Sequence, residues 1–295
     1  MTITATLVRE LRERTGAGMM DCKRALQETG GDIEAAIEAM RKSGIAKAAG
    51  KAGRIAAEGV ITIKTDETGK QAMLLEVNCE TDFVAKDESF LGFVGQLATT
   101  IVADAPADLD ALSAMPLADG AGKTVEEARQ ELVARLGENI SIRRFTLVNA
   151  NSGVLGSYIH GSRIGVVTEL NTDNTGLAKD LSMHIAASRP LYITEQDVPQ
   201  TVLDKERDIL TAQAQTPDKS DDIIKKMVEG RLGKFLKEIA LLGQPFVKEP
   251  DINVAKLLQD NAAEVLSFVR YEVGEGIEKK ADNFAEEVMQ QAGMS

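Results

Sequence analysis

Apolar residues recur along this chain with two periods, and each period predicts a different kind of element. Between residues 4 and 43 they return at every third or fourth position, which predicts three short helices. Gly16 and the glycine pair at 30–31 would end the first two helices, and Asp32 is a good N-cap for the third. Residues 44–58 are rich in Ala, Gly and Lys, a composition typical of a linker.

The next section alternates apolar and polar residues, as a half-buried strand does. Residues 61–79 contain two such runs around a turn and predict a β-hairpin with one buried face. A helix is expected over 90–101, where Phe and aliphatic residues keep helical spacing. Thr124 and Glu127 form a capping box that starts another helix, which runs through Leu136.

This order of hairpin and helix then repeats. Residues 154–170 predict a second hairpin, and residues 177–187 predict a second helix. The second strands of the two hairpins end alike, with LLEVNCETD at 74–82 and VVTELNTD at 166–173. We infer two related αβ subdomains that arose by internal duplication, and we predict an α+β fold class.

Beyond the second hairpin and helix, the apolar residues become sparse and lie among charges. Residues 199–242, which are broken at Pro217, predict an antiparallel helical hairpin that is partly exposed. Residues 265–273 return to a strand pattern, and residues 281–291 are expected to form a final helix.

Composition narrows the function classes. Trp is absent and aromatic residues make up 4%, so the cores are aliphatic. The net charge of −12 argues against a nucleic-acid partner, which requires a basic surface, although residues 1–54 hold ten Lys/Arg against seven Asp/Glu. The start does not read as a signal peptide, and no run of 18 apolar residues could span a membrane. We therefore expect a cytoplasmic protein without a membrane partner.

Catalytic, metal and nucleotide sites are not recognisable in the sequence. Residues 122–124 (Gly-Lys-Thr) would end a phosphate-binding loop, but Leu117 stands where that loop needs its first glycine. The only histidines, His160 and His184, have no Cys or His at ligand spacing. Cys79 falls on the apolar face of its strand, and a Cys79–His160 pair is the enzymatic alternative that stays open. We expect no metal, no cofactor and no catalytic residue.

Three short motifs carry apolar residues that a core does not need. The first is Thr81-Asp82-Phe83-Val84, where the pattern favours a core position for Phe83 over an exposed anchor. The others are Met19-Met20 at a helix start and the Pro-bearing loop GQPFV at 243–247. For these two motifs a core role and a binding surface fit equally well.

Six segments carry a resemblance to a known family: LRERTGAGMMDCKRAL at 11–26, EVNCETDFVAKD at 76–87, GSYIHGSRIGV at 156–166, MVEGRLGKF at 227–235, GQPFV at 243–247 and RYEVGEGIEK at 270–279. They cover nearly the whole chain in the right order. In these segments the chain resembles the family of bacterial translation elongation factor Ts, the guanine nucleotide exchange factor for elongation factor Tu.

The resemblance implies a domain plan that agrees with the pattern above. A small UBA-like domain of three helices (1–54) would precede a core of two αβ subdomains (55–148, then 149–198 with 243–275). The helical hairpin (199–242) would be inserted in the second subdomain, and a C-terminal helical module (276–295) would follow.

The resemblance also implies a binding site for elongation factor Tu. In the family the TDFV loop, residues 81–84 here, displaces elements near the Mg²⁺ and phosphate sites of the partner, with Asp82 and Phe83 as its main contacts. The other contacts carry over to Arg12, Met19, Met20, His160 and Val247. The position after Val247 is often apolar in the family but is Lys248 here.

Two rival functions stay open. One is an enzyme that uses Cys79 or His160, and the other is an adaptor that binds ubiquitin-like proteins through its N-terminal helices. The hairpin at 199–242 is also a candidate contact for a homodimer.

Overall fold

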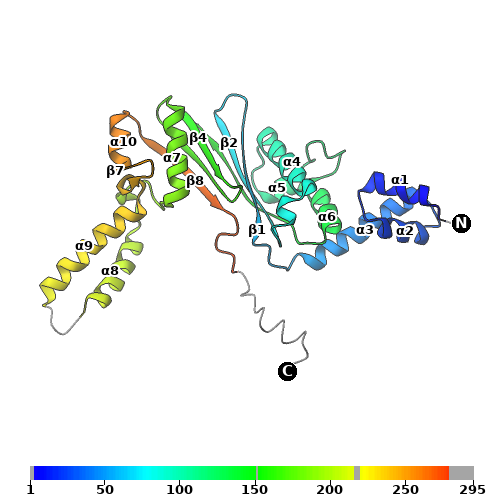
Figure 1. Ribbon diagram of the computed structural model, residues 1–295, viewed down its shortest axis with the longest axis horizontal. Coiled ribbons are helices and arrows are strands. Elements are labelled where there is room, and N and C mark those ends of the chain that lie inside the picture. Colours follow the sequence, from blue (N-terminus) through cyan, green and yellow to red (C-terminus); the bar gives the residue numbers. More distant parts are fainter. Residues whose placement is uncertain (1–2, 151, 216–219, 279–295) are drawn as a thin grey trace, which may run out of the picture.

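The computed structural model describes residues 3–150, 152–215 and 220–278, which form an elongated molecule (Figure 1). Helices α1 to α3 lie at one end, two three-stranded antiparallel sheets occupy the middle, and a helical hairpin projects from the other end. This mixture of helices and small sheets confirms the predicted α+β class.

The N-terminal region consists of the helices α1 (Ala5–Thr15), α2 (Met19–Glu28) and α3 (Ile33–Lys51). Thr4 and Asp32 cap α1 and α3 through their side chains. Gly16 ends α1 in the left-handed region at φ +66°, where any other residue would be strained. The inward residues form a small core, which contains Val8, Leu11, Cys22, Ala25, Leu26 and Ala36.

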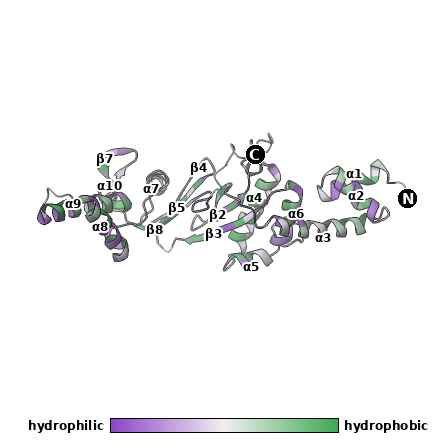
Figure 2. Cartoon of the chain, turned by 90° about the horizontal axis from the view of Figure 1, so that it is seen from below, coloured by the Kyte–Doolittle hydropathy of each residue, from purple (hydrophilic) through white to green (hydrophobic). Residues whose placement is uncertain are grey.

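The linker predicted over 44–58 is wrong in its first part, because α3 continues to Lys51, and only residues 52–57 connect α3 to β1 without helix or strand. Gly44 faces α6 (Val125–Leu136), and a Cβ built on it would lie 3.5 Å from the Cβ of Ala134. Ala48 is 2% exposed and belongs to the core of the first sheet. The small residues that suggested a linker are therefore what allows α3 to pack closely on α6 (Figure 2).

The first sheet has the order β1-β2-β3, with strands β1 (Glu58–Thr65), β2 (Gln71–Cys79) and β3 (Ser141–Asn149). The helices on its outer side are α4 (Glu88–Asp104), α5 (Leu109–Ala114) and α6 (Figure 1). The predicted hairpin and the capping box of Thr124 and Glu127 are confirmed. Strand β3 is absent from the sequence prediction, because Arg143 and Arg144 interrupt its apolar alternation.

The second sheet has the order β4-β5-β8, with strands β4 (Val154–His160), β5 (Ile164–Leu170) and β8 (Val265–Glu272). Its core also includes residues of α7 (Thr175–Ser188), α10 (Val254–Asp260) and the ribbon β6–β7 (Pro245–Phe246 and Glu249–Asn253). The predicted second hairpin and the strand near 265–273 are confirmed. The origin of the two subdomains by duplication stays a prediction. The helix expected at 281–291 lies outside the described residues.

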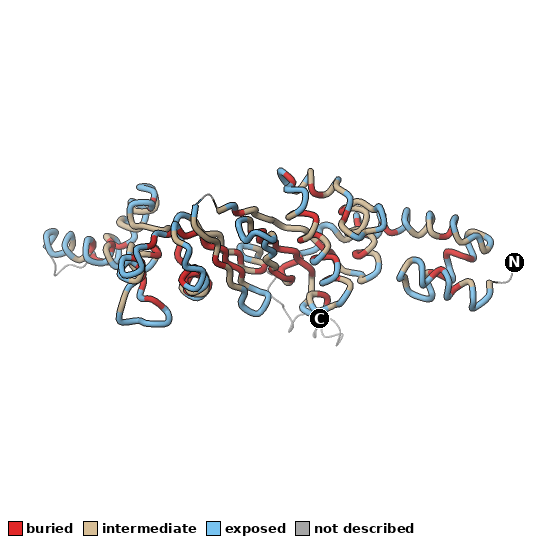
Figure 3. The backbone as a smooth tube through the Cα atoms, turned by 90° about the horizontal axis from the view of Figure 1, so that it is seen from above, coloured by how far each residue is buried: buried red, intermediate tan, exposed pale blue. Residues whose placement is uncertain are grey.

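The two sheets pack face to face, so the prediction of one buried face for the first hairpin is wrong. Met73 on β2 faces the helices, whereas Leu74 on β2 and Ile61 on β1 face the second sheet. A Cβ built on Gly165 of β5 would lie 2.5 Å from Cγ2 of Ile61, so only glycine allows this close approach. Buried residues are concentrated in these central layers (Figure 3).

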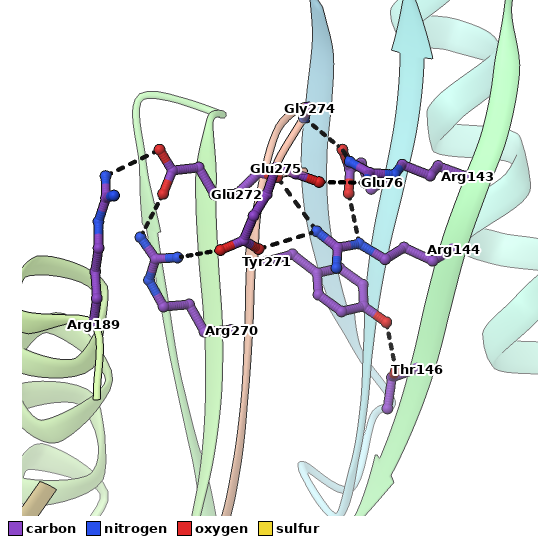
Figure 4. A network of polar contacts seen from close by, with 10 residues as sticks. All are labelled: Glu76, Arg143, Arg144, Thr146, Arg189, Arg270, Tyr271, Glu272, Gly274 and Glu275. Carbon is purple, nitrogen blue, oxygen red and sulfur yellow. Dashed lines mark hydrogen bonds and ion pairs between the residues drawn. The ribbon is translucent and has the colours of Figure 1, made fainter. Parts of the chain in front are cut away.

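A polar network joins the two sheets (Figure 4). Glu76 on β2 is fully buried and accepts hydrogen bonds from the guanidinium groups of Arg143 (2.9 Å) and Arg144 (2.6 Å) on β3. It also accepts the backbone N–H of Gly274, just beyond β8 (2.8 Å), and Arg144 lies over the ring of Tyr271 on β8. Because a buried carboxylate is costly without such partners, the network holds the sheets in one relative position.

Helices α8 (Gln200–Ala214) and α9 (Asp221–Ile239) pack side by side, which confirms the predicted hairpin (Figure 1). A short 3-10 helix, Glu195–Asp197, precedes α8, and another, Leu241–Gly243, follows α9. Ile209 and Ile223 remain exposed on the hairpin. Pro217, the expected tip, lies outside the described residues, and a homodimer through this hairpin stays a prediction.

Candidate functional site

The loop between β2 and α4 presents one aromatic ring to solvent. Phe83 is 80% exposed, so the core position that the pattern favoured for it is wrong. The reason is that α4 begins only at Glu88 and does not reach back to place Phe83 on the buried face of Phe90. Val84 is 8% exposed and packs in the core of the first sheet. The motif had implied an exposed contact at Val84. In the unbound protein Val84 is instead an internal anchor of the loop.

Hydrogen bonds hold this loop on both sides of the ring. Before it, the carbonyl of Thr81 accepts the thiol of Cys79 (3.2 Å). After it, a turn of 3-10 helix (Val84–Lys86) leads to Asp87, which accepts two backbone N–H groups at the start of α4. Asp82 is exposed and pairs with Lys86 (2.7 Å), an arrangement that contributes little stability and can be exchanged for a partner contact.

The N-terminal candidates are exposed on α1 and α2. Met19 and Met20 form the first turn of α2 and are 59% and 69% exposed, and Arg12 is exposed on α1. The core alternative for the two methionines is therefore wrong. Flexible apolar side chains at a helix start suit an adaptable binding surface.

Arg135, at the end of α6, lies between the α1–α2 turn and the start of α4. One of its guanidinium nitrogens would be 3.1 Å from a Cβ built on Gly16. The pKa of Asp87 is lowered despite the opposing effect of burial, because backbone N–H groups and the charge of Arg135 favour the carboxylate. Arg135 thus contacts the α1–α2 turn and acts on the charge of Asp87 at the start of α4.

The second-subdomain candidate His160 lies apart from this region, at the end of β4. It is exposed, and its Nδ1 lies 3.3 Å from the hydroxyl of Tyr158. Cys79 is buried in the core of the other sheet, where burial and the charges of Glu138 and Glu58 raise the pKa of its thiol to about 12. A thiol with such a pKa stays protonated at neutral pH and is a poor nucleophile. The burial of Cys79 and the raised pKa of its thiol therefore argue against a catalytic Cys79–His160 pair.

The loop at 243–247 is partly core and partly surface. Gln244 and Phe246 are buried, whereas Val247 is 42% exposed. The buried imidazole of His184 on α7 accepts the backbone N–H of Val247 at Nδ1 (3.2 Å), so its Nε2 donates to Oε1 of Gln244 (3.0 Å). Sequence reasoning missed this role of His184, because its partners are about 60 residues away; the available signal was a histidine on the apolar face of a helix.

Lys248 pairs with Asp180 on α7 (2.5 Å), so its ammonium group is bound by a carboxylate of the same protein. Within the described ranges, no cluster of His, Cys, Asp and Glu side chains could hold a metal ion. None of the helices that the structure describes is long and apolar enough to cross a membrane. What the described surface offers is a set of exposed apolar and charged side chains on folded supports.

Known proteins match this chain along nearly its whole length. The family model described as elongation factor TS matches residues 80–275. Elongation factor Ts of Thioalkalivibrio sulfidiphilus is 59% identical over 293 residues, which is 99% of each chain. The protein of the same name from Methylococcus capsulatus is 55% identical over 295 residues, covering 100% of both chains. That of Legionella pneumophila subsp. pneumophila is 54% identical over 290 residues, or 98% of each.

Proposed function

The chain belongs to the elongation factor Ts family, and from this premise we propose that it binds elongation factor Tu with GDP and promotes release of the GDP. Its family makes it a nucleotide exchange factor of translation elongation and not a catalyst. The finer proposal is that the loop at 81–84 enters the partner and displaces the elements that hold Mg²⁺ and phosphate. Such a role places the protein in the cytoplasm.

The observation that carries this proposal is the exposure of Phe83 on an anchored loop. A phenyl ring that is 80% exposed contributes little to folding, yet the residues on both sides of it are fixed by the core and by hydrogen bonds. Buried aromatic anchors carry much of the binding energy at protein interfaces. Because the loop is already ordered, little conformational entropy is lost when the ring enters a partner.

Linkage converts such binding into nucleotide release. If the chain binds nucleotide-free elongation factor Tu more tightly than the GDP form, it must weaken GDP binding by the same factor. The energy comes from the contact of Phe83 with elements around the Mg²⁺ site, and no covalent bond is made or broken. This agrees with a chain whose Cys79 is held as an unreactive thiol.

The other exposed candidates would hold the partner while the ring is inserted. Arg12, Met19 and Met20 would bind the partner from the N-terminal helices, whereas His160 and Val247 would form a further contact from the second subdomain. Contacts from both subdomains would fix the orientation of the loop relative to its target.

The proposal is tested by the rate at which labelled GDP leaves elongation factor Tu. The wild-type chain should accelerate release, and Phe83→Ala should reduce this acceleration by roughly thirtyfold, about 2 kcal/mol. Leu191→Ala is the matched control, because Leu191 is an apolar residue that is 66% exposed outside all the candidate contacts. Equal activity of the wild type and Phe83→Ala would reject the proposed role of the ring.

A further inference from the structure

We propose that Glu138 is the positioning residue of the Phe83 loop, an inference that rests on the proposed function of that loop. Glu138 lies on the turn between α6 and β3 and is 57 residues from Thr81 in the chain. No motif of the sequence points to it. Its carboxylate nevertheless makes the principal side-chain contacts with the segment that leaves β2 and leads to the exposed ring.

Both oxygens of the Glu138 carboxylate are used by the loop. Oε2 accepts the backbone N–H groups of Glu80 (3.2 Å) and Thr81 (3.0 Å). Oε1 accepts the hydroxyl of Thr81 (2.6 Å). These are charge-assisted hydrogen bonds, which are stronger than those between neutral groups. They fix the two residues at which the chain turns away from the sheet, directly before Asp82 and Phe83.

The contact is reciprocal, because the loop also binds the turn. Oε1 of Glu80 accepts the backbone N–H of Asn139 (2.6 Å), and Oε2 of Glu80 pairs with Arg54 (3.4 Å). Asn139 is 6% exposed, and its amide donates to the carbonyl of Arg54 (2.8 Å). The turn at 138–139 therefore ties the Phe83 loop to the segment that follows α3.

This arrangement explains how an exposed ring keeps a defined direction. The ring of Phe83 has few protein contacts of its own, so its position depends on the backbone before and after it. Val84 and Asp87 fix the backbone after the ring, and Glu138 fixes the backbone before it. Without Glu138 the backbone before the ring would keep the bond of Thr81 to Cys79 and the contacts of Glu80, but it would lose three hydrogen bonds. Inserting the ring would then require more ordering of the loop at the same time.

A spectroscopic reporter tests this claim in the unbound protein. Because the chain has no Trp, Phe83→Trp introduces a single indole at the position of interest. Adding Glu138→Ala should lower the fluorescence anisotropy of this indole and increase its quenching by acrylamide. Glu138→Gln should preserve most of the signal, because its carbonyl can accept both N–H groups while the Thr81 hydroxyl accepts from its amide. Glu67→Ala, an exposed residue in the β1–β2 turn, is the charge-matched control.

If Glu138→Ala does not fold, Thr81→Val replaces it in the reporter measurement, since it removes the 2.6 Å hydrogen bond with little change of shape. An anisotropy that is unchanged in folded Glu138→Ala or Thr81→Val would overturn the proposal. A loss with Glu138→Ala that Glu138→Gln restores at least in part would support it, because the amide replaces the hydrogen bonds without the charge.

A double-mutant cycle in GDP release separates positioning from general damage. In the wild-type background, Glu138→Ala should slow the release of GDP from elongation factor Tu at least about fivefold. In the Phe83→Ala background, the same substitution should slow it less than about twofold. Equal losses in both backgrounds would show that Glu138 does not act through Phe83. A Phe83→Ala variant with normal exchange, alongside a loosened reporter in Glu138→Ala, would instead contradict the proposed function and leave the anchoring of the loop intact.

Discussion

Phe83 and Val84 are neighbours in the chain but face opposite environments: the side chain of Phe83 is 80% exposed, and that of Val84 is 8% exposed. The backbone of a 3-10 turn places the two side chains on opposite sides of the loop. Val84 therefore belongs to the fold, and Phe83 is available to a partner.

Alanine substitutions at Phe83 and Val84 should lower the stability of the protein to different extents. Phe83→Ala should change the free energy of unfolding by less than about 1 kcal/mol, because little apolar surface is buried there. Val84→Ala should cost roughly 1–3 kcal/mol, because it leaves a cavity in the core. Thermal melts and GDP release measured on the same samples check this. A large stability loss in Phe83→Ala, with normal exchange by its folded fraction, would contradict the assignment.

Cys79 should be unreactive until the protein unfolds. Burial, and the charges of Glu138 and Glu58, raise the pKa of this thiol to about 12, so almost no thiolate exists at pH 8. Iodoacetamide should therefore leave Cys79 unmodified in the native protein and modify it in denaturant, as followed by peptide mass spectrometry. Rapid native alkylation that abolished exchange would revive an enzymatic or redox role for this residue.

Acid should destabilise the second subdomain through His184. Burial lowers the pKa of His184 below 6.5, although its hydrogen bond to Gln244 opposes this, so protons bind the unfolded state preferentially. The stability that neutral His184 contributes is present above pH 6.5 and is lost as the pH falls, with a slope of up to about 1.4 kcal/mol per pH unit. Denaturant unfolding at pH 7.5 and 5.5 measures the difference in the free energy of unfolding between these two pH values.

His184→Gln should flatten this pH dependence. His160→Gln is the control, because His160 is the only other histidine and is exposed. A pH dependence that follows His160, or that remains unchanged in His184→Gln, would show that His184 does not carry it.

The packing of α3 on α6 predicts a difference between two truncations. Deleting residues 1–40 keeps Gly44 and Ala48 on α6 and should leave the melting temperature of the remaining chain almost unchanged. Deleting residues 1–54 exposes that surface and should lower the melting temperature by about 3 °C or more. Both deletions should weaken binding to elongation factor Tu, because both lack Met19 and Met20. Equal melting temperatures would mean that α3 contributes nothing to the core.

Elements with local signals could be predicted from the sequence, and elements that depend on distant partners could not. The hairpins follow from alternation and the helix at 125–136 from its capping box, which are local properties. Strand β3 could not be predicted, because Arg143 and Arg144 break its pattern and meet their partner, Glu76, only when β3 pairs with β2. The small residues of α3 were interpreted as a linker for the same reason, since Gly44 meets its partner Ala134 only in the folded protein.

The candidate site shows the same division. The resemblance singled out Phe83, but the local pattern favoured the core, because a pattern cannot show where α4 starts. Glu138 carries no local signal, and the sequence places His184 only on the apolar face of a helix, since each residue acts on a segment that is far away in the chain. Their roles become visible only through the hydrogen bonds that the fold creates.

The most direct test of the central claim compares the affinity of the chain for two forms of elongation factor Tu. Titration calorimetry should show tighter binding to the nucleotide-free form than to the GDP form with Mg²⁺. The ratio of these two affinities should equal the factor by which the chain weakens GDP binding. In Phe83→Ala this ratio should fall markedly. Equal affinity of the wild-type chain for both forms would contradict the account, because a protein without that preference cannot drive nucleotide release.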